Sequence, residues 1–238
     1  MPDFIAGIHN YCDRWCEKCT FTARCRVGEA ESATSDEERD INNKAFWRNL
    51  TNIFAEAKTM ILEKAEELGI DLNAVNHEEF AENRDREKTF IHNKELIKLT
   101  EKYWKDARKT LDAKDDWLIF SPLDEYAQSE ILAIICWYQF FISAKIQRGF
   151  KGILDFDGNL DEAELNDSQS DSNGSIKVAL IAINRSIMAW TNLLSDENSK
   201  TIAPHISLLQ TIKQTTEKKF PNVQDFVRPG FDEIETVM

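Results

Sequence analysis

The sequence predicts an all-α protein, a bundle of about five helices that follows an N-terminal four-cysteine segment. Apolar residues recur at steps of three and four along several long stretches, which is the spacing of one helix face. Serine, proline and glycine stand at the ends of these stretches, where helices begin and end. No stretch alternates apolar and polar residues convincingly, as a half-buried strand does. With 42% hydrophobic residues, the 238-residue chain can bury a substantial core.

The first predicted helix begins near Asp36 and ends at Gly69. Ser35 and Glu38 match a capping box, in which the hydroxyl and the carboxylate each satisfy one free amide at the helix start. Gly69 supplies a C-terminal stop. Between these signals one apolar stripe includes Phe46, Leu50, Ile53, Phe54, Ala57, Met60, Ile61, Ala65 and Leu68. A polar connection is expected next, over residues 71–86.

Two further helices are predicted in the middle of the chain. A second apolar stripe extends from Ile91 to Leu111, with lysine and glutamate on the other faces. The third helix has a start signal at Ser121 and Pro122, a cap followed by proline at the first helical position. From Glu130 to Phe150 it is apolar around most of its circumference, so we expect it at the centre of the bundle.

The last third of the chain predicts a loop, two helices and an arm. Residues 151–174 carry seven acidic side chains with glycine, serine and asparagine, which indicates an acidic loop. The fourth helix is expected from Ser175 to Leu194 and the fifth from Pro204 to Phe220. The predicted organisation is therefore a metal-binding segment at 1–28, a helical bundle at 29–221 and a C-terminal arm at 222–238.

The amino-acid composition limits the classes of molecule that the chain is expected to bind. The formal net charge is −13, which disfavours sequence-independent binding to nucleic acid or to anionic membranes. The N-terminus lacks the basic and apolar regions of an export signal, so the chain is expected to be cytoplasmic. The apolar run at 131–142 is too short to span a bilayer. A protein partner remains open, and so does the oligomeric state.

Four of the five cysteines lie within fourteen residues, in the pattern C-x3-C-x2-C-x5-C: Cys12, Cys16, Cys19 and Cys25. In a reducing cytoplasm, clustered cysteines are more typical of a metal site than of disulfides. Thiolate sulfur suits both tetrahedral zinc and iron–sulfur clusters. The sequence therefore predicts that these four residues bind one metal centre.

The cysteine segment also resembles a known kind of cluster-binding sequence. Cys16, Cys19 and Cys25 form C-x2-C-x5-C, with the aromatic Phe21 two residues after the middle cysteine. This resembles the segments that hold [4Fe–4S] clusters in auxiliary-cluster domains of some radical-SAM enzymes and in iron–sulfur nucleases of recombination and CRISPR systems. The resemblance covers residues 12–25 and implies a [4Fe–4S] cluster with an electron-transfer, sensing or structural role.

Two alternatives to a [4Fe–4S] cluster stay open for the four cysteines. A single zinc ion would make the segment a structural clip on a helical interaction module. Free or redox-exchanging thiols are the third possibility. His9 lies three residues before Cys12 and could replace one cysteine as ligand. Under either metal, Trp15 and Phe21 would provide an apolar cover, and nearby cations would offset the thiolate charge, namely Arg14, Lys18, Arg24 and Arg26.

The remaining candidates carry weaker signals. An enzyme site inside the bundle, lined by His92, Glu130 and Arg185, is a further alternative; His92 is expected to point toward the core because of its spacing with Leu96. Residues 153–164 match part of a calcium-binding loop but lack its first carboxylate. Residues 171–177 could form an anion site at a helix start. The fifth cysteine, Cys136, is interpreted as a small buried hydrophobe.

Overall fold

A computed structural model describes residues 3–74, 77–92, 94–154 and 161–232 of the chain. These residues form helices joined by turns and loops, and no strand is formed among them, which confirms the all-α prediction. The α-helices are α1 Arg26–Ala33, α2 Asp36–Arg39, α3 Lys44–Glu67, α4 His77–His92, α5 Glu95–Asp112, α6 Glu125–Gly152, α7 Glu162–Asn166, α8 Asp171–Leu193 and α9 Ser199–Lys219. Short 3-10 helices are η1 Ile8–Asn10, η2 Cys16–Lys18, η3 Thr22–Arg24, η4 Leu72–Ala74, η5 Lys114–Asp116, η6 Leu118–Phe120 and η7 Val223–Asp225.

The chain divides into two compact units, residues 1–82 and 83–238, with the boundary inside α4. This boundary falls elsewhere than those of the three segments expected from the sequence, and those segments stay a prediction. The expectation of one bundle of about five helices is wrong in its count, because the described residues form nine α-helices. Helix α3, which was expected in the bundle, belongs to the first unit.

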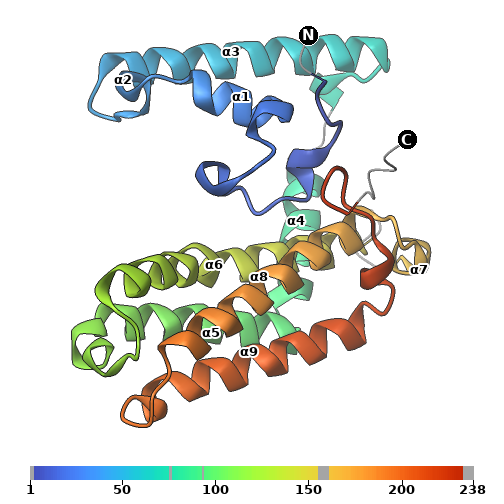
Figure 1. Ribbon diagram of the computed structural model, residues 1–238. Coiled ribbons are helices and arrows are strands. Elements are labelled where there is room, and N and C mark those ends of the chain that lie inside the picture. Colours follow the sequence, from blue (N-terminus) through green and yellow to red (C-terminus); the bar gives the residue numbers. More distant parts are fainter. Residues whose placement is uncertain (1–2, 75–76, 93, 155–160, 233–238) are drawn as a thin grey trace, which may run out of the picture. The chain divides into compact units, whose positions relative to one another are not determined.

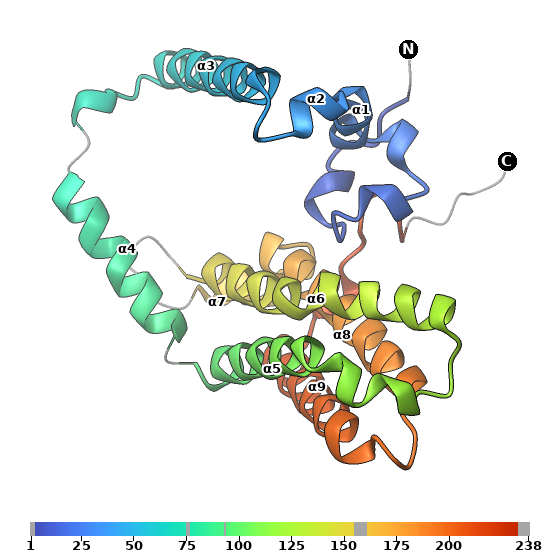
Figure 2. The same cartoon turned by 90° about the vertical axis from the view of Figure 1, so that its left-hand side faces the viewer.

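The second unit is built around four long helices. Helix α5 packs against α6 and α9, and α8 packs against α6 and α9 as well, so the four helices close a ring of contacts. Figures 1 and 2 both show them side by side. The most extensive contact joins α6 and α8. Gly149 permits this approach, because a Cβ atom there would lie 2.4 Å from Cδ1 of Ile176.

The bundle core takes one stripe from each surrounding helix and more than half of the residues of α8. Helix α6 buries Ile135, Tyr138, Ile142 and Ile146, which follow one another at steps of three and four. In α8, by contrast, 14 of 23 residues are buried, many of them glycine, alanine or serine. These small side chains let the neighbouring helices come close to the α8 backbone. Helix α8 is therefore the central element of this unit, a place that the sequence had suggested for α6.

Helix α6 keeps an exposed apolar face. Trp137 and Phe140 are 37% and 59% exposed, and Cys136 is exposed rather than buried, which corrects the interpretation of this thiol as a core residue. Within the described part of the chain, α6 is the helix long and apolar enough to cross a membrane by length and composition alone. The core helix of a soluble protein meets the same criterion, so the expectation of no membrane stays a prediction.

Competing caps explain most differences between expected and observed helix ends. The capping box of Ser35 and Glu38 is present, but it begins the four-residue α2, and α3 starts separately with Asn43 as its cap. Asp124, rather than Ser121, caps α6 by accepting a hydrogen bond from the Ala127 amide at 2.8 Å. The polar connection expected over 71–86 is also wrong in part, because residues 77–92 form α4.

The two C-terminal helices begin earlier than predicted. Ser170 caps α8, so this helix starts at Asp171 and takes over the end of the predicted acidic loop. Helix α9 starts at Ser199, and Pro204 lies inside it rather than at its first position. Proline removes one helical hydrogen bond there, a loss that is smallest near a helix start.

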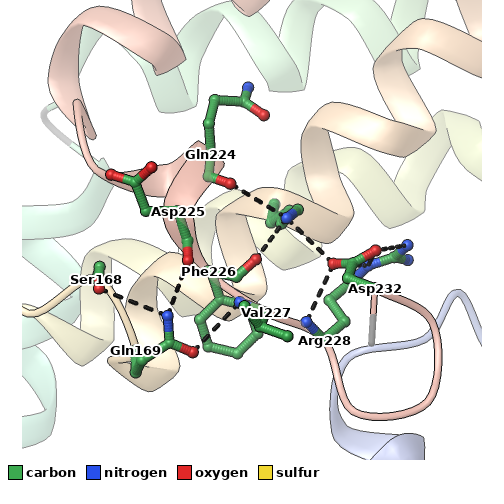
Figure 3. A network of polar contacts seen from close by, with 9 residues as sticks. Ser168, Gln169, Gln224, Asp225, Phe226, Val227, Arg228 and Asp232 are labelled. Atoms are coloured by element: carbon green, nitrogen blue, oxygen red, sulfur yellow. Dashed lines mark hydrogen bonds and ion pairs between the residues drawn. The ribbon is translucent and has the colours of Figure 1, made fainter. Parts of the chain in front are cut away.

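The segment after α9 is attached to the bundle. Val223 and Phe226 are buried, and Figure 3 shows the polar contacts around Phe226. Lys177 of α8 donates to the carbonyl oxygens of Gln224 and Phe226 and lies 3.1 Å from the carboxylate of Asp232. Residues 222–232 therefore pack against the start of α8.

Candidate metal centre

The four cysteines lie on a stretch of short turns that leads into α1. Cys16 opens η2, and the amide of Cys19 donates to the carbonyl oxygen of Cys16 at 3.1 Å. Cys25 directly precedes α1, and its carbonyl accepts from the amide of Glu29 at 2.8 Å. Cys12 lies just after η1. The segment thus has a defined backbone although its regular elements are only three residues long.

Thr22 braces the turn between the two central cysteines. Its hydroxyl donates to the carbonyl oxygen of Cys19 at 2.9 Å and to that of Cys16 at 3.3 Å. Gly28 of α1 lies against this threonine, because a Cβ atom at Gly28 would be 3.0 Å from both the methyl carbon and the carbonyl oxygen of Thr22. Helix α1 and η3 are in direct contact here. Thr22 therefore binds the C-x2-C turn through its hydroxyl and contacts α1 through its methyl and carbonyl groups.

The sulfur atoms have partly protected surroundings. Cys25 is buried, while Cys12, Cys16 and Cys19 are half-buried. The amide of Phe21 donates to Sγ of Cys19 at 3.4 Å. Hydrogen bonds to ligand sulfurs of this kind tune iron–sulfur clusters and support metal–thiolate sites.

Cys16 lies within electrostatic reach of the other three cysteines. Burial raises the pKa of the Cys16 thiol, and further increases come from Cys12, Glu31, Cys19 and Cys25 in that order of size. A thiolate among other thiolates is unfavourable without a cation. The other three cysteines and one carboxylate of α1 thus contribute to the electrostatic surroundings of Cys16.

The cysteines do not converge on one point, however. Among the described residues, no three side chains of histidine, cysteine, aspartate or glutamate are placed so that they could hold a metal ion. The thiol of Cys12 instead lies 3.5 Å from the carbonyl oxygen of His9. The donor set suits a soft metal, because four thiols lie on one short segment, but coordination requires these side chains to lose their protons and to turn toward a common centre.

The segment combines an unusual backbone conformation with a locally positive charge. Arg14, between Cys12 and Cys16, has a φ of 59°, and it is the one non-glycine residue in the described ranges with a positive φ. Such strained residues concentrate at functional sites. Apart from the cysteines, residues 12–26 carry four cations, Arg14, Lys18, Arg24 and Arg26, against Asp13 and Glu17, a local charge of 4 − 2 = +2 in a chain of net charge −13.

The residues suggested for an enzyme site lie at the surface. His92 is exposed, contrary to the expectation that it points toward the core. Its ring contacts the carbonyl oxygen of Lys88 at 2.8 Å and lies 3.8 Å from the carboxylate of Glu101. The physical reason is that His92 ends α4 while Leu96 belongs to α5, so the two do not share a helical register. Glu130 and Arg185 are exposed as well.

Residues suggested for a calcium loop and for an anion site instead cap a helix or form ion pairs, at the starts of α7 and α8. Residues 155–160 of the partial calcium loop lie outside the described residues, and Asp161 caps α7 by accepting from the amides of Ala163 and Glu164. At the start of α8, Asp171 pairs with Arg148 at 2.6 Å. Lys177 is taken up by Asp232 and by backbone oxygens. Arg148 and Lys177 are therefore already paired with acidic residues of the chain itself.

One polar cluster in the core was given no role by sequence reasoning. His205 of α9 is 5% exposed and lies 2.9 Å through Nε2 from the hydroxyl of Thr110. The signal was present in the sequence, because His205 falls in line with the buried positions Ile202, Leu209, Ile212 and Thr216 at steps of three and four. The neighbours of His205 are buried aromatic rings, Tyr103 and Trp190.

Comparison of the chain with protein-family models, with curated proteins and with solved structures finds no match.

Proposed function

We propose that this chain binds a metal centre through Cys12, Cys16, Cys19 and Cys25, in the form of a [4Fe–4S] cluster in a cytoplasmic protein. The supporting observation is the spacing of four thiols on one short segment whose C-x2-C turn Thr22 braces. The locally positive charge compensates the anionic cluster with its four thiolates. The amide that donates to Sγ of Cys19 would lower the electron density on one ligand.

The cluster gives the chain an electron-transfer, sensing or structural role. A [4Fe–4S] centre exchanges single electrons at a potential set by charge, hydrogen bonds and solvent exposure. Three of the four cysteines are half-buried, so solvent and a docked redox protein would both reach the edge of the centre. The proposed partner is accordingly another protein.

Zinc is the second candidate, and the turn at Cys16 favours it. The C-x2-C turn, closed by the hydrogen bond from the Cys19 amide to the Cys16 carbonyl, has the ligand spacing of structural zinc sites. With zinc the segment would stabilise the first unit without redox chemistry. Few residues of this unit are buried, so a metal would supply a large part of its stability.

The test is metal analysis and a visible spectrum of full-length protein purified without oxygen. A [4Fe–4S] centre gives brown protein with about four irons per chain that bleaches on reduction. A colourless protein with about one zinc per chain selects the second candidate.

Two variants assign the metal to its ligands. The double variant Cys16→Ser, Cys19→Ser is expected to lose the metal, whereas Cys136→Ser, which changes an exposed cysteine on α6, keeps it. Metal-free wild-type protein, or equal metal content in both variants, contradicts the proposal.

A further inference from the structure

Helix α3 presents an apolar face that the described residues of the first unit leave open. Of its 24 residues only Ala65 is buried. The large apolar side chains on the face are 53–66% exposed, namely Trp47, Ile53, Phe54, Met60 and Ile61. Leu68, at the helix end, is 60% exposed. Within the described chain, α2 is the element that packs closely on α3.

These side chains share one continuous face. At about 100° per residue they occupy an arc of roughly 140°, together with Phe46, Leu50 and Ala57. The glutamates and Arg48 lie outside this arc, and Lys64, which pairs with Glu67, is the one charged side chain of α3 inside it. The helix is roughly 36 Å long. Two such faces in contact would bury on the order of 1,000 Å², which is near the lower limit for a specific protein interface. The face is therefore large enough to hold a second helix of equal length.

The charge along α3 is divided between its halves. Residues 44–55 carry Lys44 and Arg48 and no acid, a charge of +2. Residues 56–67 carry four glutamates and two lysines, a charge of 2 − 4 = −2. This order opposes the helix dipole, which favours acids at the N-terminus and cations at the C-terminus. A partner helix of reversed polarity would bring opposite charges together, and an identical antiparallel helix has that distribution.

The apolar pattern is also partly symmetric about Ala57, although Trp47 and Leu50 have the charged counterparts Glu67 and Lys64. Side chains at equal distance on either side of it form matched pairs, which are Phe54 with Met60, Ile53 with Ile61, and Phe46 with Leu68. A small residue at the centre lets two helix axes approach closely. A two-fold axis through this point would place each residue of a pair against its counterpart, as in an isologous dimer.

We propose that the partner of this face is a second copy of the chain, with the two α3 helices packed antiparallel and crossing near Ala57. The proposal is independent of the metal centre. An anionic membrane fits the face less well, because the C-terminal half of the helix is acidic. The dimer covers the apolar stripe and pairs the basic half of each helix with the acidic half of the other.

The first test is the mass of the full chain in solution, measured by light scattering across a range of concentrations. Wild-type protein is expected at twice the chain mass of 27.5 kDa. Phe54→Glu with Ile61→Glu places charge in the stripe and gives the 27.5 kDa monomer at the same concentrations. Both positions are exposed in the single chain, so circular dichroism is expected to show unchanged helix content.

Leu62→Glu is the matched control, because Leu62 is 49% exposed but lies well outside the stripe. This variant stays dimeric. A monomeric wild-type chain at every concentration overturns the proposal, as does a dimer that Phe54→Glu with Ile61→Glu leaves intact.

The second test determines the direction of the helices. A photoreactive benzoylphenylalanine replaces Leu68 in a mixture of isotopically light and heavy chains. The antiparallel arrangement predicts cross-links between light and heavy chains that reach residues near Phe46. Cross-links to the region around Leu68 of the other chain, or cross-links confined to one chain, overturn it.

Discussion

The imidazole of His205 is stacked on the indole of Trp190, with ring centroids 4.5 Å apart and planes inclined by 16°. Both rings are buried between α8 and α9. The hydroxyl of Thr110 on α5 lies against Nε2 of the same histidine. Three helices of the bundle are therefore joined at one titratable side chain.

This position makes the stability of the second unit depend on pH. Burial lowers the pKa of His205 from 6.5 to about 4, an effect that Asp106 opposes and Lys102 reinforces. Between these values the unfolded chain binds more protons than the folded one, so stability rises with pH and is lost as pH falls from about 6.5 to about 4. The full loss is about 3 kcal/mol. Urea unfolding followed by tryptophan fluorescence at pH 7 and pH 4.5 measures it.

The comparison variant is His205→Gln, which removes the titration and keeps a polar group. Its unfolding free energy is expected to change less between the two pH values than that of wild type. Equal changes in the two proteins would show that other groups cause the dependence.

Tyr103 and Trp190 form a second buried link, in which the indole Nε1 donates to the tyrosine hydroxyl at 3.2 Å. Burial raises the pKa of Tyr103 to about 12, so the hydroxyl stays protonated at all ordinary pH values. Tyr103→Phe leaves the indole N–H without its acceptor and is expected to destabilise the fold by about 1–3 kcal/mol. Tyr126→Phe, at a residue that is 78% exposed, is the control and changes stability by less than about 0.5 kcal/mol. Similar values for both variants would contradict the role of this bond.

Asp232 holds the C-terminal segment on α8. Burial raises the pKa of its carboxyl, but hydrogen bonds from Arg228 and Lys177 outweigh burial and hold the pKa well below its ordinary value. This contribution is present above pH 3.8, the ordinary pKa, and is lost as pH falls below it. Asp232→Asn is expected to speed amide exchange in residues 223–231 by roughly tenfold, since a charged hydrogen bond contributes about 1.5 kcal/mol or more.

Asp225→Asn provides the control for this segment. Asp225 is exposed, and its backbone oxygen, rather than its carboxylate, accepts from Gln169. Mass spectrometry of exchanged peptides compares the two variants. Fast exchange in both would place the attachment elsewhere, for instance on the buried Phe226.

Thr22 provides a prediction for the proposed metal centre. Thr22→Val removes the hydroxyl that joins the carbonyls of Cys16 and Cys19, and it is expected to weaken metal retention roughly 10- to 100-fold, as loss of outer-shell partners does. Competition with a chelator measures the effect. Thr20→Val, at an exposed threonine of the same segment, leaves retention unchanged. Equal retention in both variants would show that the brace does not support the centre.

Local rules of helix formation account for what the sequence predicted well. The capping box at Ser35 and the stop at Gly69 are present, and Gly69 has the left-handed φ of 66° that such a stop requires. The choice between two nearby caps was harder, because Ser121 and Asp124 are both suitable and only the packing of the helix decides. The assignment of α3 to a separate unit depends on tertiary contacts, which periodicity does not encode.

In the candidate site too, features set by nearby residues could be predicted from the sequence, whereas contacts between separate elements could not. The spacing of four cysteines identifies the donors, because ligand type and loop length are local properties. The contact of Gly28 with Thr22 and the influence of Glu31 on Cys16 depend on how α1 folds back on the segment. The prediction that His92 points toward the core was wrong for a related reason. It assumed that one helix continues through His92 and Leu96, whereas the chain breaks between α4 and α5.

The burial of α8 has a consequence for divergence among relatives. Most positions of this helix face another helix, and many hold glycine, alanine or serine, so few substitutions there preserve the packing. Where selection acts on folding alone, exposed positions on the other helices tolerate many substitutions. A distant relative would therefore retain the small-residue pattern of α8 after most of its remaining sequence had changed.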